Sequence, residues 1–204
     1  MSVLKIVLLI LLSYFIGGIS VSILLSRILY GRDVRSCGSG NAGATNMARS
    51  FGLKMGVITL LCDVLKAVIS ILIGEALLGD WGLCIAGTAC LLGHCYPALH
   101  GFKGGKGVSV CAALMWAIDW RAGAAALLVF ALTAVLSRKV SLGSVCAAAV
   151  LSAAALVLSP GWPKLILAVF CTVTVILRHR ENIARLINGT EPDFKPGRRE
   201  NRKQ

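Results

Sequence analysis

Residues 82–118 read GLCIAGTACLLGHCYPALHGFKGGKGVSVCAALMWAI, in which a glycine- and lysine-rich stretch separates two apolar runs. The apolar runs have the composition of membrane-spanning helices. Glycine lets backbone N–H groups turn toward a ligand, and a lysine ammonium adds a positive charge. The stretch Gly101–Gly107 therefore predicts a phosphate-binding loop at a membrane surface.

The composition of the whole chain gives the fold class. Of its 204 residues 57% are hydrophobic and only 15% are charged, with a mean hydropathy of +0.81. Soluble domains have about half apolar and about a quarter charged residues. We therefore expect an all-α integral membrane protein with one domain over 1–204, in which residues 183–204 form a basic cytoplasmic tail.

The apolar runs predict about seven transmembrane helices, since a spanning helix needs about 20 apolar residues or fewer inside a bundle. We place them near residues 3–29, 53–77, 82–99, 107–118, 122–137, 141–158 and 162–178. Only Asp119-Trp-Arg121 separates the fourth from the fifth. A single kinked or re-entrant pair is the alternative there.

Lysine and arginine counts predict the orientation. With the N-terminus outside, the inner segments hold seventeen of these residues and the outer segments only Lys5, Arg121 and Lys164, with Lys66 inside a span. The positive-inside rule then places the C-terminus in the cytoplasm, together with most of the net charge of +12. We expect the basic tail to contact lipid headgroups. A nucleic-acid partner is not expected, because no basic helix is interleaved with aromatic residues.

The cysteine and histidine patterns predict no metal site. The eight cysteines form no C-x-x-C pair, and His94, His100 and His179 do not recur with them at ligand spacing. Scattered cysteines in apolar helices are usually small packing residues. We expect neither a metal nor a cofactor.

Two further polar clusters fall on the same predicted side as Gly101–Gly107. They are Ser39–Arg49, rich in small hydrogen-bonding residues, and Arg178–Asn182. Irregular backbone near a membrane is tolerated where it lines a watery cavity. The three clusters therefore predict one shared pocket.

Several residues in these runs have a structural explanation as well. His94 lies near the end of an apolar run, where a buried structural histidine is as good an interpretation as a functional one. Asp63 and Lys66, three residues apart, either pair on one helix face or reach the pocket. Arg178 is either functional or extends to the membrane interface.

The three clusters together match a family pattern. They read S-G-N-x-G-A-T-N-x-x-R at Ser39–Arg49, G-H-x-x-P with F-K-G-G-K-G-V within Gly93–Val108, and R-H-x-x-N-I-x-R-L with G-x-E within Arg178–Glu191. Over essentially its whole length the chain resembles the bacterial membrane acyl-phosphate:glycerol-3-phosphate acyltransferases. The resemblance implies transfer of a fatty acyl group from acyl phosphate to the 1-hydroxyl of sn-glycerol 3-phosphate. The product would be 1-acyl-sn-glycerol 3-phosphate, made at the cytoplasmic side of a bacterial plasma membrane for phospholipid synthesis.

The resemblance and the chemistry of the side chains suggest roles. Arg49, Lys106 and the amides of Gly104 and Gly105 would hold phosphate groups. The predicted catalytic residues are Ser39, Arg49, His94, Lys106, His179 and Asn182, and the predicted substrate-binding residues are Asn41, Thr45, Asn46, Lys103, Gly104, Gly105 and Gly107.

The residue that accepts the hydroxyl proton is left open. His94 or His179 is one choice, and a phosphate oxygen of the substrate is the other. The sequence lacks an H-x-x-x-x-D arrangement, since Leu99 is the fifth residue after His94. This absence favours substrate assistance.

Two other function classes compete with the enzyme, a transporter of organic phosphates and a non-catalytic lipid-binding protein. The charges gather at one face rather than at the membrane midplane, which disfavours the transporter. The sequence leaves the acyl chain length and the oligomeric state open.

Overall fold

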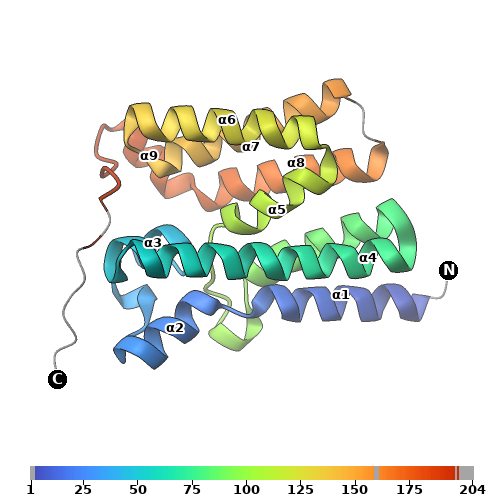
Figure 1. Ribbon diagram of the computed structural model, residues 1–204, viewed down its shortest axis with the longest axis horizontal. Helices are drawn as coiled ribbons and strands as arrows, with labels where there is room; N and C mark the ends of the chain where they lie inside the picture. Colours follow the sequence, from blue (N-terminus) through green and yellow to red (C-terminus); the bar gives the residue numbers. More distant parts are fainter. Residues whose placement is uncertain (1–2, 159–160, 196, 198–204) are drawn as a thin grey trace.

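The structure, a computed structural model, describes residues 3–158, 161–195 and 197, and its regular elements there are all helices (Figure 1). The apolar runs become α-helices because a helix pairs the backbone polar groups that lipid cannot. In chain order the elements are α1 (Val3–Gly18), α2 (Val21–Tyr30), η1 (Val34–Ser36), α3 (Ala44–Phe51), α4 (Leu53–Cys95), η2 (Ala98–His100), α5 (Val108–Ile118), α6 (Trp120–Ser137), α7 (Val140–Leu158), α8 (Trp162–Arg178) and α9 (Arg180–Ile187).

Helices lie in all seven predicted ranges, but fewer of them have the length of a span. By length and composition four segments of the described chain could cross a membrane, namely Val3–Tyr30, Leu53–His100, Trp120–Ser137 and Val140–Leu158. The pair α8 and α9, bent by 61°, makes a fifth when it is counted as one span, and α5 is shorter. The protein is thus an all-helical, multi-pass membrane protein, while the number of seven spans stays a prediction.

The long α4 folds back on itself. Leu78 and Gly79 have non-helical backbone angles, and Gly79 has a φ of 59°, which favours glycine. A Cβ on Gly74 would lie 2.3 Å from the carbonyl oxygen of Gly82, so the two arms cross closely. The predicted spans 53–77 and 82–99 therefore correspond to the two arms of one helical hairpin.

The other boundaries differ in detail from the prediction. The first predicted span is broken at Ile19–Ser20, between α1 and α2. Between α5 and α6 the break is the single residue Asp119, whose carboxylate accepts hydrogen bonds from the N–H groups of Arg121 and Ala122. This is an N-terminal cap, which ends one helix and starts the next.

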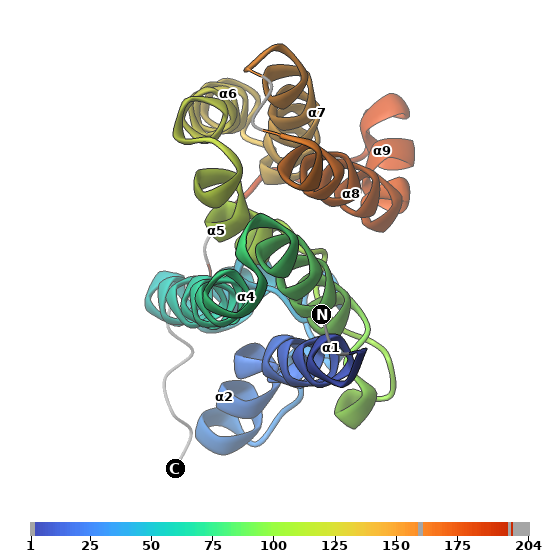
Figure 2. The same ribbon diagram turned by 90° about the vertical axis from the view of Figure 1, so that its right-hand side faces the viewer.

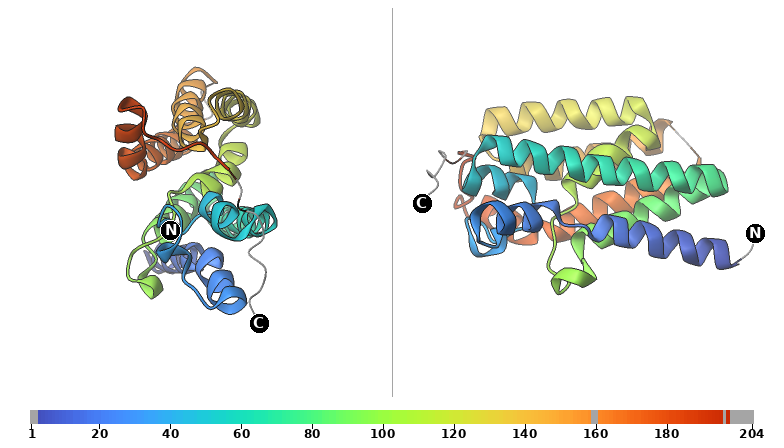
Figure 3. Two further views of the ribbon diagram at one scale, coloured as in Figure 1. Left: turned by 90° about the vertical axis from the view of Figure 1, so that its left-hand side faces the viewer. Right: turned by 60° about the horizontal axis from the view of Figure 1, so that its bottom comes forward.

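Two groups of helices make up the molecule. Figure 2 shows α1, α2 and α4 on one side, α6 to α9 on the other, and α5 between them. Within the first group α1 lies along α4, which Figure 3 shows from further angles. Glycine permits this approach, since a Cβ on Gly93 would lie only 2.0 Å from the Tyr14 carbonyl oxygen.

The described part of the predicted tail, residues 183–195 and 197, belongs to the fold. It begins inside α9, and the chain after α9 returns to the protein, where the Phe194 N–H donates to the Arg138 carbonyl at 2.8 Å. The Gly197 N–H likewise donates to the Ala48 carbonyl at 3.1 Å. The last basic residues predicted to contact lipid, Arg198, Arg199, Arg202 and Lys203, lie outside the described residues.

Candidate active site

The three predicted clusters meet around one cavity of about 540 Å³. It lies between the two helix groups, with walls from the α3 region, the end of α4, the start of α5, α7 and α9. The predicted residues that line it are Ser39, Asn41, Thr45, Asn46, Arg49, His94, Lys106, His179 and Asn182. The predicted convergence is therefore confirmed, while the role of each residue stays a prediction.

The remaining predicted residues lie elsewhere. Lys103 and Gly104 line a second, more open polar cavity of about 930 Å³, which shares Ser39, Asn41 and Lys106 with the first. Gly105 and Gly107 line neither of these two cavities.

The glycine loop does not present its amides to a ligand as the sequence suggested. The Gly104 N–H donates to the Cys95 carbonyl at 3.2 Å, and the Gly105 N–H donates to the His94 carbonyl at 3.1 Å. Both donors are thus used inside the protein. The expectation that these two amides hold phosphate was wrong for this structure.

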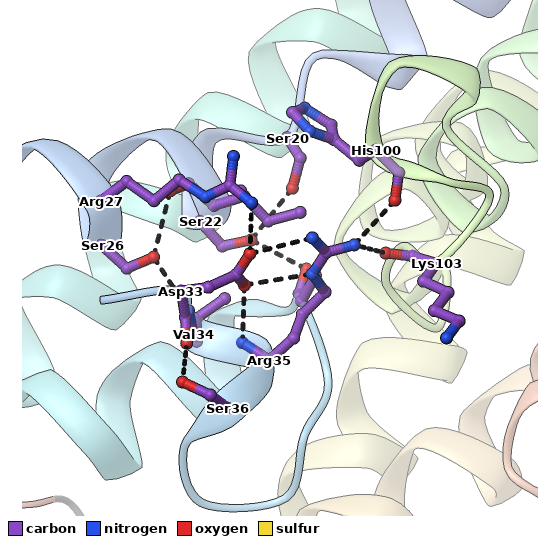
Figure 4. A network of polar contacts seen from close by, with 12 residues as sticks. Ser20, Ser22, Ser26, Arg27, Asp33, Val34, Arg35, Ser36, His100 and Lys103 are labelled. Carbon is purple, nitrogen blue, oxygen red and sulfur yellow. Dashed lines mark hydrogen bonds and ion pairs between the residues drawn. The ribbon is translucent and has the colours of Figure 1, made fainter. Parts of the chain in front are cut away.

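Two arginines hold the carbonyl side of the same loop. Arg35 donates to the carbonyl oxygens of His100, at 2.7 Å, and Lys103, at 3.2 Å (Figure 4). Arg178 donates to those of Gly104, at 3.3 Å, and Gly105, at 3.0 Å. The loop is therefore fixed by its backbone between two helix groups, and Arg178 does more than extend to the interface.

Asp33 orients the first of these arginines. Its carboxylate accepts three hydrogen bonds from Arg35, at 2.9 to 3.1 Å, and a fourth from Arg27 at 2.7 Å. The hydrogen bonds from Arg35 hold the pKa of Asp33 well below its usual range. In Figure 4 the Lys103 ammonium points away from this network, and Lys103 lines the second polar cavity.

Close packing explains why Gly105 is glycine. A Cβ at this position would lie 2.1 Å from His94 Nε2 and 2.7 Å from its Cε1. At Gly104 a Cβ would lie 2.1 Å from the His94 carbonyl oxygen. The glycines thus let the loop lie directly against His94, and the loop carries Lys106 to the cavity.

Asn46 acts on its own loop rather than on a ligand. Its side-chain nitrogen donates to the carbonyl oxygens of Val34, Cys37 and Asn41, each at 3.0 Å. Its Oδ1 accepts from the Ser39 N–H at 2.9 Å, and the residue is 1% exposed. The prediction that Asn46 binds substrate is therefore corrected, because its hydrogen-bonding capacity fixes the loop that carries Ser39 and Asn41.

Arg49 is available to bind an anion. It lies in α3 and lines the cavity, and no carboxylate of the described residues is within ion-pair distance of it. A guanidinium can bind two phosphate oxygens at once. Arg49 is therefore the best placed phosphate ligand of the first cluster.

A chain of hydrogen bonds connects the second and third clusters. Lys106 Nζ donates to Asn182 Oδ1, and Asn182 Nδ2 donates to Glu191 Oε1 at 2.6 Å. Glu191 also accepts from Ser141 Oγ at 2.6 Å and from Arg185 Nε at 2.8 Å. Asn182 is thereby oriented from both sides, by Lys106 and by Glu191.

The functional roles of Glu191, Ser141 and Arg185 did not follow from the sequence. Glu191 ends the quoted G-x-E pattern, so its position offered a signal, whereas Ser141 belongs to no quoted pattern. Burial acts to raise the pKa of Glu191, but hydrogen bonds from Ser141, Asn182 and Arg185 prevail and leave it below its ordinary value. Burial lowers the pKa of Lys106.

The two cavity histidines have different neighbours. His179 Nδ1 lies 2.8 Å from the Val175 carbonyl oxygen, which can only accept, so Nδ1 carries a proton. His94 is buried beside Asp63 and Lys66, and these three side chains form an internal polar cluster. Asp63 and Lys66 thus pair with each other and reach the site through His94.

An apolar groove of about 200 Å³ adjoins the polar cavity. The two share Leu60, Val108, Phe130 and Ser144, and the groove continues between α5, α6, α7 and α8. Its accessible lining is entirely apolar. Such a groove can hold an alkyl chain whose polar end lies in the cavity.

The cysteines and acidic residues take no part in a metal centre within the described chain. All eight cysteines are free thiols, and no group of three or more His, Cys, Asp or Glu residues there could hold a metal ion.

Comparison with known proteins identifies the family of this chain. A model described as glycerol-3-phosphate acyltransferase matches residues 7–189. The glycerol-3-phosphate acyltransferase of Syntrophotalea carbinolica is 42% identical over 186 residues, covering 90% of this chain and 94% of that protein. The one from Jannaschia sp. is 40% identical over 185 residues, covering 89% of each.

Solved structures agree in fold. The crystal structure of PlsY (YgiH), an integral membrane glycerol 3-phosphate acyltransferase, in its glycerol 3-phosphate form has a TM-score of 0.89 and 35% identity. The match covers 94% of this chain and 96% of that one. The lysophosphatidic acid form has a TM-score of 0.86 and 34% identity. The chain therefore belongs to the glycerol-3-phosphate acyltransferase family of integral membrane proteins.

Proposed function

We propose that this glycerol-3-phosphate acyltransferase takes its acyl group from acyl phosphate and forms 1-acyl-sn-glycerol 3-phosphate. The observation that carries the proposal is the junction of the apolar groove with a cationic polar cavity. An acyl phosphate has both parts, an alkyl chain and a phosphate. With the chain in the groove, the reactive carbonyl lies at the junction, where a small polar alcohol can meet it.

Phosphate binding is supported by the cations of the two polar cavities. Arg49 and Lys106 line the first, and Lys103 lines the second. Both substrates carry a phosphate, so we assign one to the Arg49 side and the other to the lysine side. Because acyl phosphate has a good leaving group, positioning and charge neutralisation are the main tasks of the protein, without a metal or cofactor.

We propose that a substrate phosphate oxygen accepts the hydroxyl proton. A histidine base needs its positive charge stabilised after it takes the proton. No carboxylate of the described residues lies within 4.0 Å of His179, whose Nδ1 is bonded to a backbone carbonyl. Substrate assistance predicts that His179→Gln lowers kcat by less than about a thousandfold, and a larger loss at saturating substrate would contradict it.

We further propose seven crossings with the N-terminus outside, the C-terminus in the cytoplasm and the active site on the cytoplasmic side of a bacterial plasma membrane. The arrangement of the helix ends supports this topology. Figure 1 shows the start of α1, the α4 turn and the start of α8 at one end, and α3 and α9 at the other. The basic residues 32–54 and 178–185 fall at the second end, which the positive-inside rule assigns to the cytoplasm.

The direct test is an assay of purified protein in detergent. We expect product from palmitoyl phosphate and sn-glycerol 3-phosphate, identified by mass spectrometry, and none from palmitoyl-coenzyme A. Product only from the thioester would refute the donor assignment. A transporter or a lipid-binding protein would give no product at all, since neither makes a covalent bond.

A pair of arginine variants connects the activity with the cavity. Arg49→Gln should lower kcat/KM by about a hundredfold or more, because it removes a charged phosphate ligand. Arg32→Gln is the matched control, since Arg32 is exposed and lines neither polar cavity. Equal effects of the two substitutions would contradict the assignment of the cavity as the active site.

A further inference from the structure

Lys66 makes polar contacts with three neighbours at the centre of the first helix group. Its Nζ lies 2.8 Å from Asp63 Oδ1, 2.9 Å from the Ile19 carbonyl oxygen and 3.1 Å from His94 Nδ1. The Ile19 carbonyl is available because the chain breaks between α1 and α2 at this residue. Lys66, Asp63 and His94 are 6%, 2% and 6% exposed, so water does not replace these contacts.

The number of donors determines the state of the imidazole. A lysine ammonium has three N–H donors and no acceptor. Asp63 Oδ1 and the Ile19 carbonyl accept two of these bonds, so the third goes to His94 Nδ1, which must offer its lone pair. Asp63 itself is 3.7 Å from His94 Nδ1, beyond hydrogen-bond distance, and its other oxygen accepts from Ser109 Oγ at 2.9 Å.

We infer that Lys66, held by Asp63, fixes His94 as the neutral tautomer with its proton on Nε2, and that this N–H donates to a substrate oxygen in the cavity. His94 lines the cavity, and no hydrogen bond to a described residue occupies Nε2. The Gly105 backbone packs against the imidazole beside this nitrogen, and a Cβ there would lie 2.1 Å from it. His94 therefore cannot act as a base through Nε2.

The two cavity histidines then have opposite tautomers. His179 carries its proton on Nδ1 and offers a lone pair at Nε2, whereas His94 offers a donor. In acyl transfer, negative charge develops on the oxygens of the acyl group, and a fixed donor stabilises it. This use of His94 rests on the proposed function, and Lys66 and Asp63 are positioning residues that act through it.

The tautomer is tested first on the unsubstituted protein. The full chain with ¹⁵N-labelled histidine is placed in detergent, and the ¹H–¹⁵N coupling pattern reports which ring nitrogen carries the proton. The His94→Gln spectrum identifies the His94 signals by their disappearance. We expect a single neutral Nε2–H form. A neutral Nδ1–H form or an imidazolium would overturn the inference.

Kinetics then distinguish a donor from a base. His94→Leu should lower kcat about a hundredfold with the KM for glycerol 3-phosphate within about threefold, as when one transition-state donor is lost. His94→Gln restores an N–H at similar reach and should recover kcat to within about tenfold of the unsubstituted protein. Equal losses in the two variants would refute the donor role.

A double substitution tests the positioning pair without leaving a buried charge unpaired. Asp63→Asn with Lys66→Met should give a mixture of His94 tautomers and a lower kcat. The control double substitution, Asp80→Asn with Lys164→Gln, removes an ion pair of 3.0 Å between the α4 turn and the start of α8. It should change neither the His94 tautomer nor kcat. A single Nε2–H form in the first double variant would overturn the role of Lys66. An inactive unsubstituted protein would refute the proposed function and leave the tautomer result standing.

Discussion

Gly105→Ala is expected to lower kcat/KM for glycerol 3-phosphate by about a hundredfold. The new Cβ would lie 2.1 Å from His94 Nε2, whereas ordinary contacts begin at 3.4 Å, so the groups must separate by about 1.3 Å. His94 has little freedom to retreat, because its Nδ1 side lies 3.1 Å from Lys66. The loop must therefore move, and a displacement of about 1 Å costs on the order of a hundredfold in rate.

The same displacement also weakens the fold. The loop carries Lys106, and moving it disturbs the Gly105 N–H bond to the His94 carbonyl and the Arg178 bonds to the loop. Overpacking of this kind costs about 1–3 kcal/mol in the free energy of unfolding. We expect a lower thermal midpoint together with the lost activity.

The assay measures initial rates with palmitoyl phosphate and a thermal unfolding curve for each variant. Gly18→Ala is the matched control, because a Cβ there meets its nearest neighbour at 3.8 Å, an ordinary contact, in a helix. The control should keep both rate and midpoint. If Gly105→Ala retained its kcat/KM within about threefold, the packing argument would be refuted.

Three further predictions concern other parts of the site. Lys106 has a lowered pKa, so its ammonium is lost as pH rises through that value. The KM for glycerol 3-phosphate should therefore rise at alkaline pH. Lys106→Arg should move this rise to higher pH, and an unchanged pH profile of KM in the variant would contradict phosphate binding by Lys106. Glu191 has a pKa below its unfolded value, so its stabilisation is present above about pH 5 and disappears as pH falls through the folded pKa. Glu191→Gln should accordingly lower the thermal midpoint at pH 7. The difference in midpoint between the variant and the unsubstituted protein should shrink in acid, and a difference that stays constant with pH would contradict this role of Glu191. Ala147→Phe places a ring in the apolar groove. It should reduce kcat/KM about tenfold for palmitoyl phosphate but not for butyryl phosphate, whose acyl chain is short. Equal losses for the two substrates would show that the acyl chain binds elsewhere.

Sequence patterns predicted the helical segments and the breaks near Leu78–Gly79 and Asp119, but not the break inside the first apolar run. Long apolar runs leave a membrane helix as the only way to pair the backbone groups, so the helices followed from composition. The break at Ile19–Ser20 directly follows Gly17-Gly18, but the run contains no proline and its apolar character continues across the break. Its significance appears only in space, where the freed Ile19 carbonyl accepts from Lys66.

The candidate site shows the same division. The three clusters and their common cavity were predictable, because one side of the membrane collects the polar segments. Two roles were not. The amides of Gly104 and Gly105 are taken by backbone carbonyls, and the Asn46 side chain is taken by its own loop. A hydrogen-bonding group in a sequence does not reveal whether its partner is internal.

The sequence by itself determined that this chain is a helical membrane protein whose polar residues gather in three clusters, because composition and charge act locally and need no partner. The tertiary structure decided which of those polar groups remain available to a ligand. Packing brought Lys66 to His94 and Glu191 to Asn182, across 28 and 9 residues of chain. Once such contacts form, they fix protons and orientations that local pattern leaves undetermined.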